Sequence, residues 1–159
     1  MLLIADTSPL LSLILIDKLD LLEKLYGNFL IPNAVWNELT SHAAIKKYNT
    51  ELQFLSQKIR KLPFKITPIN GIDIGETECI WLYKELNADY LLIDDKKGRE
   101  IAELNEINCV GTLTVIFKAK EKYILPEIKS LFVKLIENKR FYSKPLMNYF
   151  LELANEKLL

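Results

Sequence analysis

Three aspartates stand at the ends of two apolar segments that nearly repeat each other. LLIAD covers residues 2–6 and LLIDD covers 91–95, so Asp6, Asp94 and Asp95 each follow a run typical of a buried strand. The residues that flank the two segments do not match, which excludes an internal repeat. The functional crevice of an open parallel sheet lies beyond the carboxyl ends of its strands. We therefore expect both segments to deliver their carboxylates to one edge.

Two glutamates are placed to reach the same edge. Glu38 lies one helical turn beyond the apolar segment 28–32, on the helix face that we expect to turn inward. Glu76 lies in the first turn of another predicted helix. Each has a simpler interpretation, an exposed helix glutamate for Glu38 and a capping box with Asp73 for Glu76. The convergence of these acids on one edge nevertheless favours a functional role for both glutamates.

The residue types absent from this edge limit its chemistry. His42 is the only histidine, and its polar surroundings predict a surface position. Cys79 and Cys109 are the only cysteines, and we interpret them as reduced, buried apolar residues. A zinc site and paired-histidine catalysis are therefore excluded. Crowded carboxylates with only oxygen ligands favour Mg²⁺ or Mn²⁺, and these ions suit hydrolysis of a phosphodiester bond.

The composition is that of one globular domain spanning the whole chain. The 159 residues are half hydrophobic and include only five glycines, which suits a single packed core. The 21 basic and 21 acidic residues balance, so any contact with nucleic acid must come from a local patch. The stretch 52–72 has no acidic residue and contains Lys58, Arg60, Lys61 and Lys65. A solvated helix face and loop explain this stretch equally well.

The amino-terminal segment does not resemble a targeting or membrane segment. It carries no basic leader, and Asp6 interrupts its apolar run. The longest fully apolar run there, residues 13–16, is far shorter than the ~20 residues of a membrane span. We therefore expect a cytoplasmic protein.

Apolar strands alternate with helices along the chain. Strands are predicted at residues 2–5, 28–32, 88–95 and 109–111, and helices at 9–16, 20–27, 33–39, 45–59, 71–87, 96–108, 112–122, 126–138 and 145–158. This alternation is typical of βαβ units, in which helices cover both faces of a parallel sheet. The predicted fold class is α/β, a three-layer α/β/α sandwich with a central parallel sheet.

Four motifs follow one another along the chain: DTSPL at residues 6–10, GETE at 75–78, LLIDDKKGR at 91–99 and VGTL at 110–113. With them the whole chain resembles a PIN-domain protein, and within that superfamily it is most similar to the branch called domain of unknown function 3368. The resemblance implies a Mg²⁺- or Mn²⁺-dependent ribonuclease, of the kind that is the toxin of many bacterial toxin–antitoxin pairs. RNA and an antitoxin protein are the implied partners.

The resemblance also implies roles for the acidic residues. Asp6, Glu38, Glu76 and Asp95 match the catalytic acids, and Asp6, Glu76, Asp94 and Asp95 match the metal ligands. One departure concerns the third acid, which in the toxins is often an aspartate within a helix. Here it is the longer Glu76, near a capping position.

The adjacent aspartates are expected to differ in role because successive strand side chains point to opposite faces. Matching LLIAD to LLIDD places Asp95 on Asp6 and Asp94 on Ala5. We therefore predict Asp95 as the direct metal ligand. Asp94 is expected to orient a metal-bound water or to cap the helix that begins near Lys97.

Two other classes of carboxylate enzyme fit less well. A phosphoaspartate receiver needs its aspartate pair on the first strand, and a haloacid-dehalogenase-type phosphatase needs Asp-x-Asp there. The first strand here ends in Asp-Thr-Ser instead. The alternative that stays open is a PIN fold that binds RNA or a protein without cutting.

Two apolar helices suggest association. Helix 9–16 is apolar on nearly every face, and the closing helix places Leu146, Tyr149, Phe150 and Leu153 at helical spacing. Together they offer more apolar surface than a domain of this size needs for its core. We predict a homodimer, with burial in the core as the alternative.

Overall fold

A five-stranded parallel sheet forms the centre of the molecule. The computed structural model describes all residues, Met1–Leu159, as an α/β fold. The strand order is β3-β2-β1-β4-β5, and every neighbouring pair is parallel. The strands are β1 Leu2–Ala5, β2 Asn28–Pro32, β3 Ile59–Arg60, β4 Tyr90–Leu92 and β5 Cys109–Val110. The predicted fold class is confirmed.

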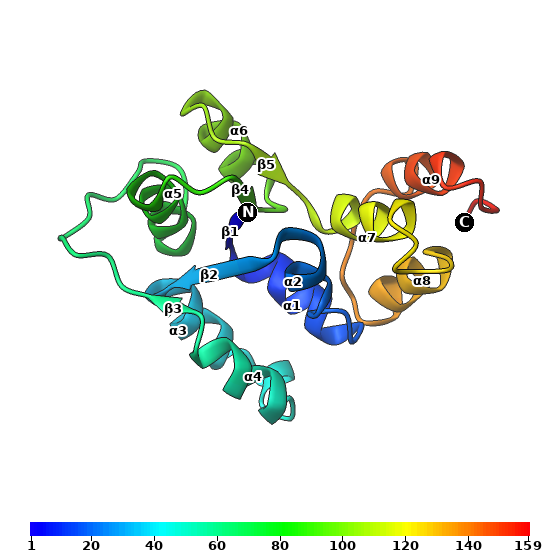
Figure 1. Cartoon of the computed structure of the whole chain (residues 1–159), viewed down its shortest axis with the longest axis horizontal. Coiled ribbons are helices and arrows are strands. Elements are labelled where there is room, and N and C mark those ends of the chain that lie inside the picture. Colours follow the sequence, from blue (N-terminus) through cyan, green and yellow to red (C-terminus); the bar gives the residue numbers. More distant parts are fainter.

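Helices lie on both sides of this sheet (Figure 1). Helix α5 packs against β1, β2 and β4 with α3 beside it, while α1 and α2 pack against α7. Helices α8 and α9 lie farther out, beyond α7. The helices are α1 Thr7–Leu15, α2 Leu21–Tyr26, α3 Asn33–Ser41, the short 3₁₀ helix η1 Ala43–Ile45, α4 Asn49–Ser56, α5 Ile74–Leu86, α6 Lys96–Leu104, α7 Thr112–Glu121, α8 Lys129–Glu137 and α9 Lys144–Leu153.

The chain changes direction across the sheet at β1. From β1 it runs through β2 to β3 at one edge, and then returns to β4 and β5 on the other side of β1. Ligands of open parallel sheets bind at such a switch point, beyond the carboxyl ends of the strands. Strands β1 and β4 are therefore direct neighbours at the position where a site is expected. This confirms that the two aspartate-ended segments lie side by side.

The register of β1 and β4 differs from the one that the matching pentapeptides suggested. Ala5 pairs with Leu92, and the backbone amide of Asp6 donates to the carbonyl oxygen of Leu92 at 3.0 Å. Asp6 is therefore level with Ile93, and Asp95 lies two residues beyond it. The predicted superposition of Asp95 on Asp6 is wrong, because strand pairing depends on neighbouring side chains and not on the similarity of two segments.

The segment between α3 and α5 departs most from the sequence prediction. A single helix was expected at residues 45–59, whereas the chain forms η1, then α4 over Asn49–Ser56, and then β3. Strand β3 has only two residues and pairs with the end of β2, Ile31 with Ile59 and Pro32 with Arg60. Such a short strand leaves no periodic pattern to read.

Only some of the basic residues in the same region lack an ion-pair partner. Lys58 donates to Glu23 at 2.5 Å and to Asn28 at 3.3 Å, so its charge is neutralised. Arg60, Lys61 and Lys65 are exposed and form no ion pair. The candidate patch therefore consists of three cations and not four.

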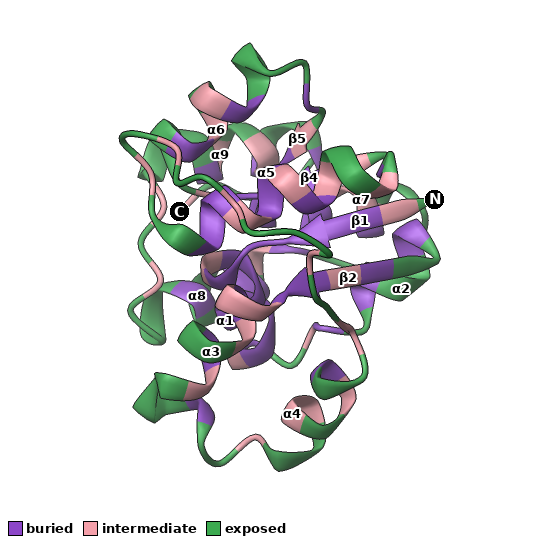
Figure 2. Ribbon diagram, turned by 90° about the vertical axis from the view of Figure 1, so that its left-hand side faces the viewer, coloured by how far each residue is buried: buried purple, intermediate pink, exposed green.

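The two apolar helices differ in burial (Figure 2). In α1 all residues from Pro9 to Ile14 are buried within this chain, so this helix offers no surface for a partner. In α9, Met147 and Leu151 face the core, while Leu146, Tyr149 and Leu153 are exposed. The homodimer stays a prediction, and it depends on α9 alone. No helix combines the length and apolar character that a membrane crossing requires.

Candidate active site

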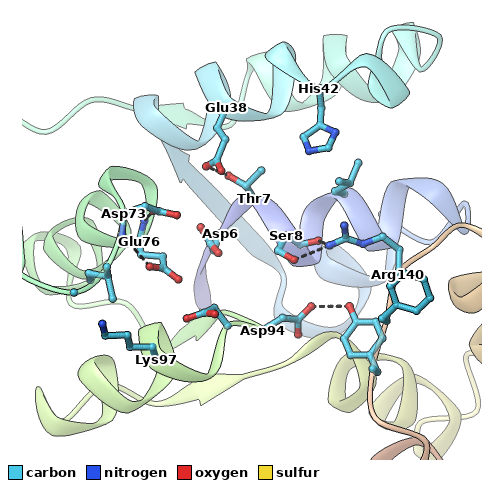
Figure 3. Close-up of a pocket in the computed structure, with 16 residues that line it drawn as sticks. Asp6, Thr7, Ser8, Glu38, His42, Asp73, Glu76, Asp94, Lys97 and Arg140 are labelled. Atoms are coloured by element: carbon cyan, nitrogen blue, oxygen red, sulfur yellow. Dashed lines mark hydrogen bonds between the residues drawn. The ribbon is translucent and has the colours of Figure 1, made fainter.

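A pocket of about 800 Å³ lies beyond the carboxyl ends of β1 and β4 (Figure 3). All five acidic residues predicted from the sequence line it: Asp6, Glu38, Glu76, Asp94 and Asp95. They come from four different parts of the chain, which the sheet brings to one edge. The structure therefore gathers every predicted site residue in one place.

Asp6 lies at the floor of this pocket. It follows β1 directly, in extended backbone at the N-cap position of α1, and its side chain caps no helix amide. Only 5% of the residue is exposed. Burial raises the pKa of Asp6 to about 8, and the charges of Glu76, Asp73 and Glu38 contribute to this rise. The free carboxyl of Asp6 therefore lacks the cation that would keep it ionised.

Glu76 is the second buried acid. Its Oε2 accepts from the Asp73 amide at 3.1 Å, and Asp73 Oδ1 accepts from the Glu76 amide at 2.8 Å, which is a complete capping box. Burial raises the pKa of Glu76 to about 7, and the nearby carboxylates of Asp73 and Asp95 add to this effect. The capping and pocket interpretations are thus both correct, because one carboxylate oxygen caps α5 while the side chain lines the pocket.

The start of α6 packs directly on Glu76. Asp95 caps this helix, and its Oδ1 accepts from the Gly98 amide at 2.8 Å. A Cβ atom at Gly98 would lie 2.5 Å from Glu76 Oε1 and 2.7 Å from Ile93 Cδ1, so both side chains would have to shift to accept it. Glycine at this position therefore lets the first turn of α6 approach the site, and it sets the position of Glu76 relative to Asp95.

Glu38 stands at the rim of the pocket. Its side chain was expected to face inward, but the residue is exposed on α3. The Thr7 hydroxyl donates to Glu38 Oε2 at 2.7 Å and ties α3 to the first residue of α1. Oε1 of Glu38 receives no hydrogen bond from the protein, so this oxygen keeps its lone pairs free.

Asp94 is bound on the side of the pocket that faces α7. Its Oδ1 accepts from the Thr112 amide at 2.8 Å, and its Oδ2 accepts from the Thr112 hydroxyl at 2.6 Å and from the Tyr142 hydroxyl at 2.7 Å. The prediction that Asp94 caps the helix near Lys97 is wrong, since Asp95 caps that helix and Asp94 holds the start of α7. Three donors already occupy its oxygens, so Asp94 is the least available of the four predicted metal ligands.

The donor set fits Mg²⁺ or Mn²⁺, although the acids surround the pocket more widely than a bound ion requires. No three acidic, histidine or cysteine side chains are close enough to hold an ion in the present arrangement. Asp6 and Glu76 are buried carboxyls with raised pKa values, and no lysine or arginine forms an ion pair with either. Asp95 lies beside Glu76. A hard cation with oxygen ligands would supply the missing positive charge.

The sequence did not indicate the residues that close the pocket on the side of α9. The segment between α8 and α9 brings Arg140, Phe141 and Tyr142 into the lining. Arg140 Nη2 donates to the Ser8 hydroxyl at 2.6 Å and Nε donates to the Ser12 hydroxyl at 2.9 Å. No motif marks this segment, because its role depends on the chain returning to α1 after 128 residues.

His42 and Lys97 also line the pocket. His42 is exposed, as predicted, but it stands at the pocket rim. Lys97 lies in the first turn of α6, next to Gly71. Of the cysteines, Cys79 is buried and Cys109 is half-buried, and both are free thiols. The expectation of two reduced, buried cysteines therefore holds completely only for Cys79.

We expect Asp94→Asn to destabilise the fold. An amide has one acceptor oxygen in place of two, so either the Thr112 amide or the two hydroxyls of Thr112 and Tyr142 lose their acceptor inside the protein. The loss should lower the free energy of unfolding by about 1–3 kcal/mol. Urea unfolding measures this, and Asp20→Asn is a matched control because Asp20 is exposed and its side chain forms a hydrogen bond and an ion pair only with Lys24. Equal stability of the two variants would contradict the anchoring role.

Comparison with known proteins agrees with this fold. The family model of DUF3368, described as a PIN domain, matches residues 2–156. Among solved structures, the fold is similar to a PilT N-terminus domain protein from the hyperthermophilic archaeon Sulfolobus solfataricus. The two share 17% identity with a TM-score of 0.52, over 72% of this chain and 90% of that one. No curated protein matches. PIN domains are typically nucleases that use divalent metals. The chain belongs to the DUF3368 family of PIN domains.

Proposed function

We propose that the protein is a Mg²⁺- or Mn²⁺-dependent endoribonuclease that hydrolyses phosphodiester bonds of RNA. The observation that carries the proposal is the pair of buried acids, Asp6 and Glu76, whose pKa values are raised to about 8 and about 7 at the switch point of the sheet. Burial of carboxyl groups without a counter-charge destabilises the folded protein, so folding alone does not explain why they are there. A bound cation and an anionic substrate explain their presence.

Asp6, Glu76 and Asp95 would hold the metal. When bound, the ion would neutralise these carboxylates and polarise the phosphoryl oxygen of the substrate. Asp94 would not coordinate the ion; it accepts hydrogen bonds from the start of α7 and from Tyr142 and so holds one wall of the pocket in place. Its three hydrogen bonds are better suited to this supporting role than to direct coordination.

Glu38 is placed to act on a proton. Thr7 holds one of its oxygens at 2.7 Å, which fixes the carboxylate at the pocket rim and leaves the other oxygen free. We assign to this free oxygen the removal of a proton from the attacking water. Its exposure keeps it in contact with solvent, from which that water comes.

We also propose that the protein acts as a toxin. Its proposed protein partners are an antitoxin and a second copy of this chain. The exposed Leu146, Tyr149 and Leu153 of α9 support a partner surface away from the pocket. The alternative proposal, a binding module that does not cut, is favoured by the absence of three converging ligands in the present arrangement.

Cleavage assays on the purified full chain separate these functions. We expect a single-stranded oligoribonucleotide labelled at one end to be cut in Mn²⁺ or Mg²⁺ and to stay intact in EDTA. Cleavage that continues in EDTA would contradict the metal mechanism. An oligonucleotide that binds but stays intact with either ion would overturn the nuclease proposal in favour of the binding module.

A further inference from the structure

An exposed aromatic ring stands at the mouth of the pocket between two anchored residues. Phe141 is 80% exposed although it lines the same pocket as the acids. On one side of it, Arg140 is held by Ser8 and Ser12. On the other side, Tyr142 OH lies 2.8 Å from the Ser12 hydroxyl and donates to Asp94. The backbone is thus fixed on both sides of Phe141, and its ring is kept out of the core.

The guanidinium of the preceding residue, Arg140, keeps its positive charge available. All hydrogen bonds that the Arg140 guanidinium makes within the protein go to neutral oxygens of Ser8 and Ser12, and no carboxylate pairs with it. Lys97 also forms no ion pair, and in Figure 3 it lies on the far side of Asp6 from Arg140. A pocket rich in acids therefore retains two unpaired cations, one on each side.

Two observations limit the kind of ligand that can bind beside Arg140 and Phe141. Only four of the 16 lining residues are hydrophobic, so an apolar peptide or lipid would leave most of the lining polar groups unpaired. An exposed flat ring and an unpaired guanidinium that line the same pocket instead match the two chemical parts of a nucleotide. The base can stack on the ring, and the phosphate can accept hydrogen bonds from the guanidinium.

We infer that Phe141 and Arg140 form a nucleotide subsite that takes an unpaired base and its phosphate from a single strand next to the bond to be cut. This inference rests on the proposed nuclease function and narrows its substrate class. A base in a duplex is already stacked and paired, so it cannot cover the Phe141 ring without being extruded. The subsite thus selects single-stranded segments, loops or ends over duplex RNA.

Binding of a labelled single-stranded oligoribonucleotide tests the subsite apart from cleavage. The full chain carrying Asp6→Asn would be used so that no bond is cut, and affinity would be followed by fluorescence anisotropy. We expect Phe141→Ala to weaken binding at least about fivefold, whereas Phe141→Tyr keeps a ring and should stay within about twofold of the parent. The matched control is Tyr123→Ala, because Tyr123 is 96% exposed and lies outside the pocket.

Oligonucleotides with a single abasic site identify the base that stacks. When the abasic site lies at the position that stacks on Phe141, the parent and Phe141→Ala should bind the oligonucleotide with the same affinity. The base that would stack on the ring is then already missing. Binding that is unchanged in Phe141→Ala, or weakened equally in Tyr123→Ala, would overturn the subsite while leaving the nuclease proposal intact. An equal loss for duplex RNA would overturn the selection of single strands. Failure of every variant to bind RNA would overturn both proposals.

Discussion

Asp6→Asn is expected to abolish RNA cleavage and the stabilisation of the protein by Mn²⁺. The substitution keeps the shape of the side chain and removes its charge at the most buried position of the pocket acids. A wild-type site should gain about 2.7 kcal/mol of stability when Mn²⁺ is present at 100 times its Kd. We expect Asp6→Asn to lose most of this gain, and to lower the cleavage rate at least on the order of a hundredfold.

The control for this prediction is the same chemical change outside the pocket. Asp20→Asn removes an exposed carboxylate that pairs only with Lys24, so cleavage and the Mn²⁺ shift should stay at the wild-type level. Thermal unfolding with and without Mn²⁺ and a timed cleavage assay measure both properties. A variant at Asp6 that still cuts RNA at the wild-type rate would rule out this carboxylate as a metal ligand.

The sheet and its site edge could be predicted because their signals are local. The segments that form β1 and β4 are continuous apolar runs, as expected for strands buried on both faces. The same physics places the residue that follows each strand at the crevice. Asp6, Asp94 and Asp95 could therefore be assigned to one edge from these runs alone. Strand β3, with two residues, has no such signal.

The roles within the site depended on contacts that no local pattern encodes. The two-residue offset between β1 and β4 is set by pairing across the sheet, so the resemblance of LLIAD to LLIDD could not reveal it. Asp94 and Asp95 were expected to differ in role, but the partners of Asp94, Thr112 and Tyr142, lie 18 and 48 residues away along the chain. Arg140 reaches the pocket only because the segment between α8 and α9 folds back over α1.

The pocket also predicts how stability depends on pH in the absence of metal. Asp6 has a folded pKa of about 8 against an ordinary value of 3.8, and Glu76 has one of about 7 against 4.5. Between these values the folded chain holds protons that the unfolded chain has released. The free energy of unfolding must then decrease as the pH rises. The contribution of the two acids is complete below about pH 4 and is lost as the pH passes 7 and then 8.

Other shifted groups act outside this window. The pKa of Glu156 is lowered by hydrogen bonds from Lys120 and from the amides of Ile128 and Lys129, despite partial burial, so its contribution is lost only in acid. Burial raises the pKa values of Cys79 and Cys109 above an ordinary value that is already 9. The fall in stability between pH 5 and 8 can therefore be attributed to the pocket acids.

We expect the metal-free protein to lose several kcal/mol of unfolding free energy between pH 5 and pH 8, because each proton that only the folded chain holds is worth about 1.4 kcal/mol per pH unit. Urea unfolding in EDTA at several pH values measures this loss. Asp6→Asn should flatten the pH dependence and be more stable than the wild type at pH 8, because it removes the buried charge. Mn²⁺ should stabilise the wild type most at pH 8, where protons no longer compete for the carboxylates. A wild-type stability that rises from pH 5 to pH 8 in EDTA would mean that Asp6 and Glu76 are already neutralised by groups of the protein itself, and the pocket would then have no need of a metal.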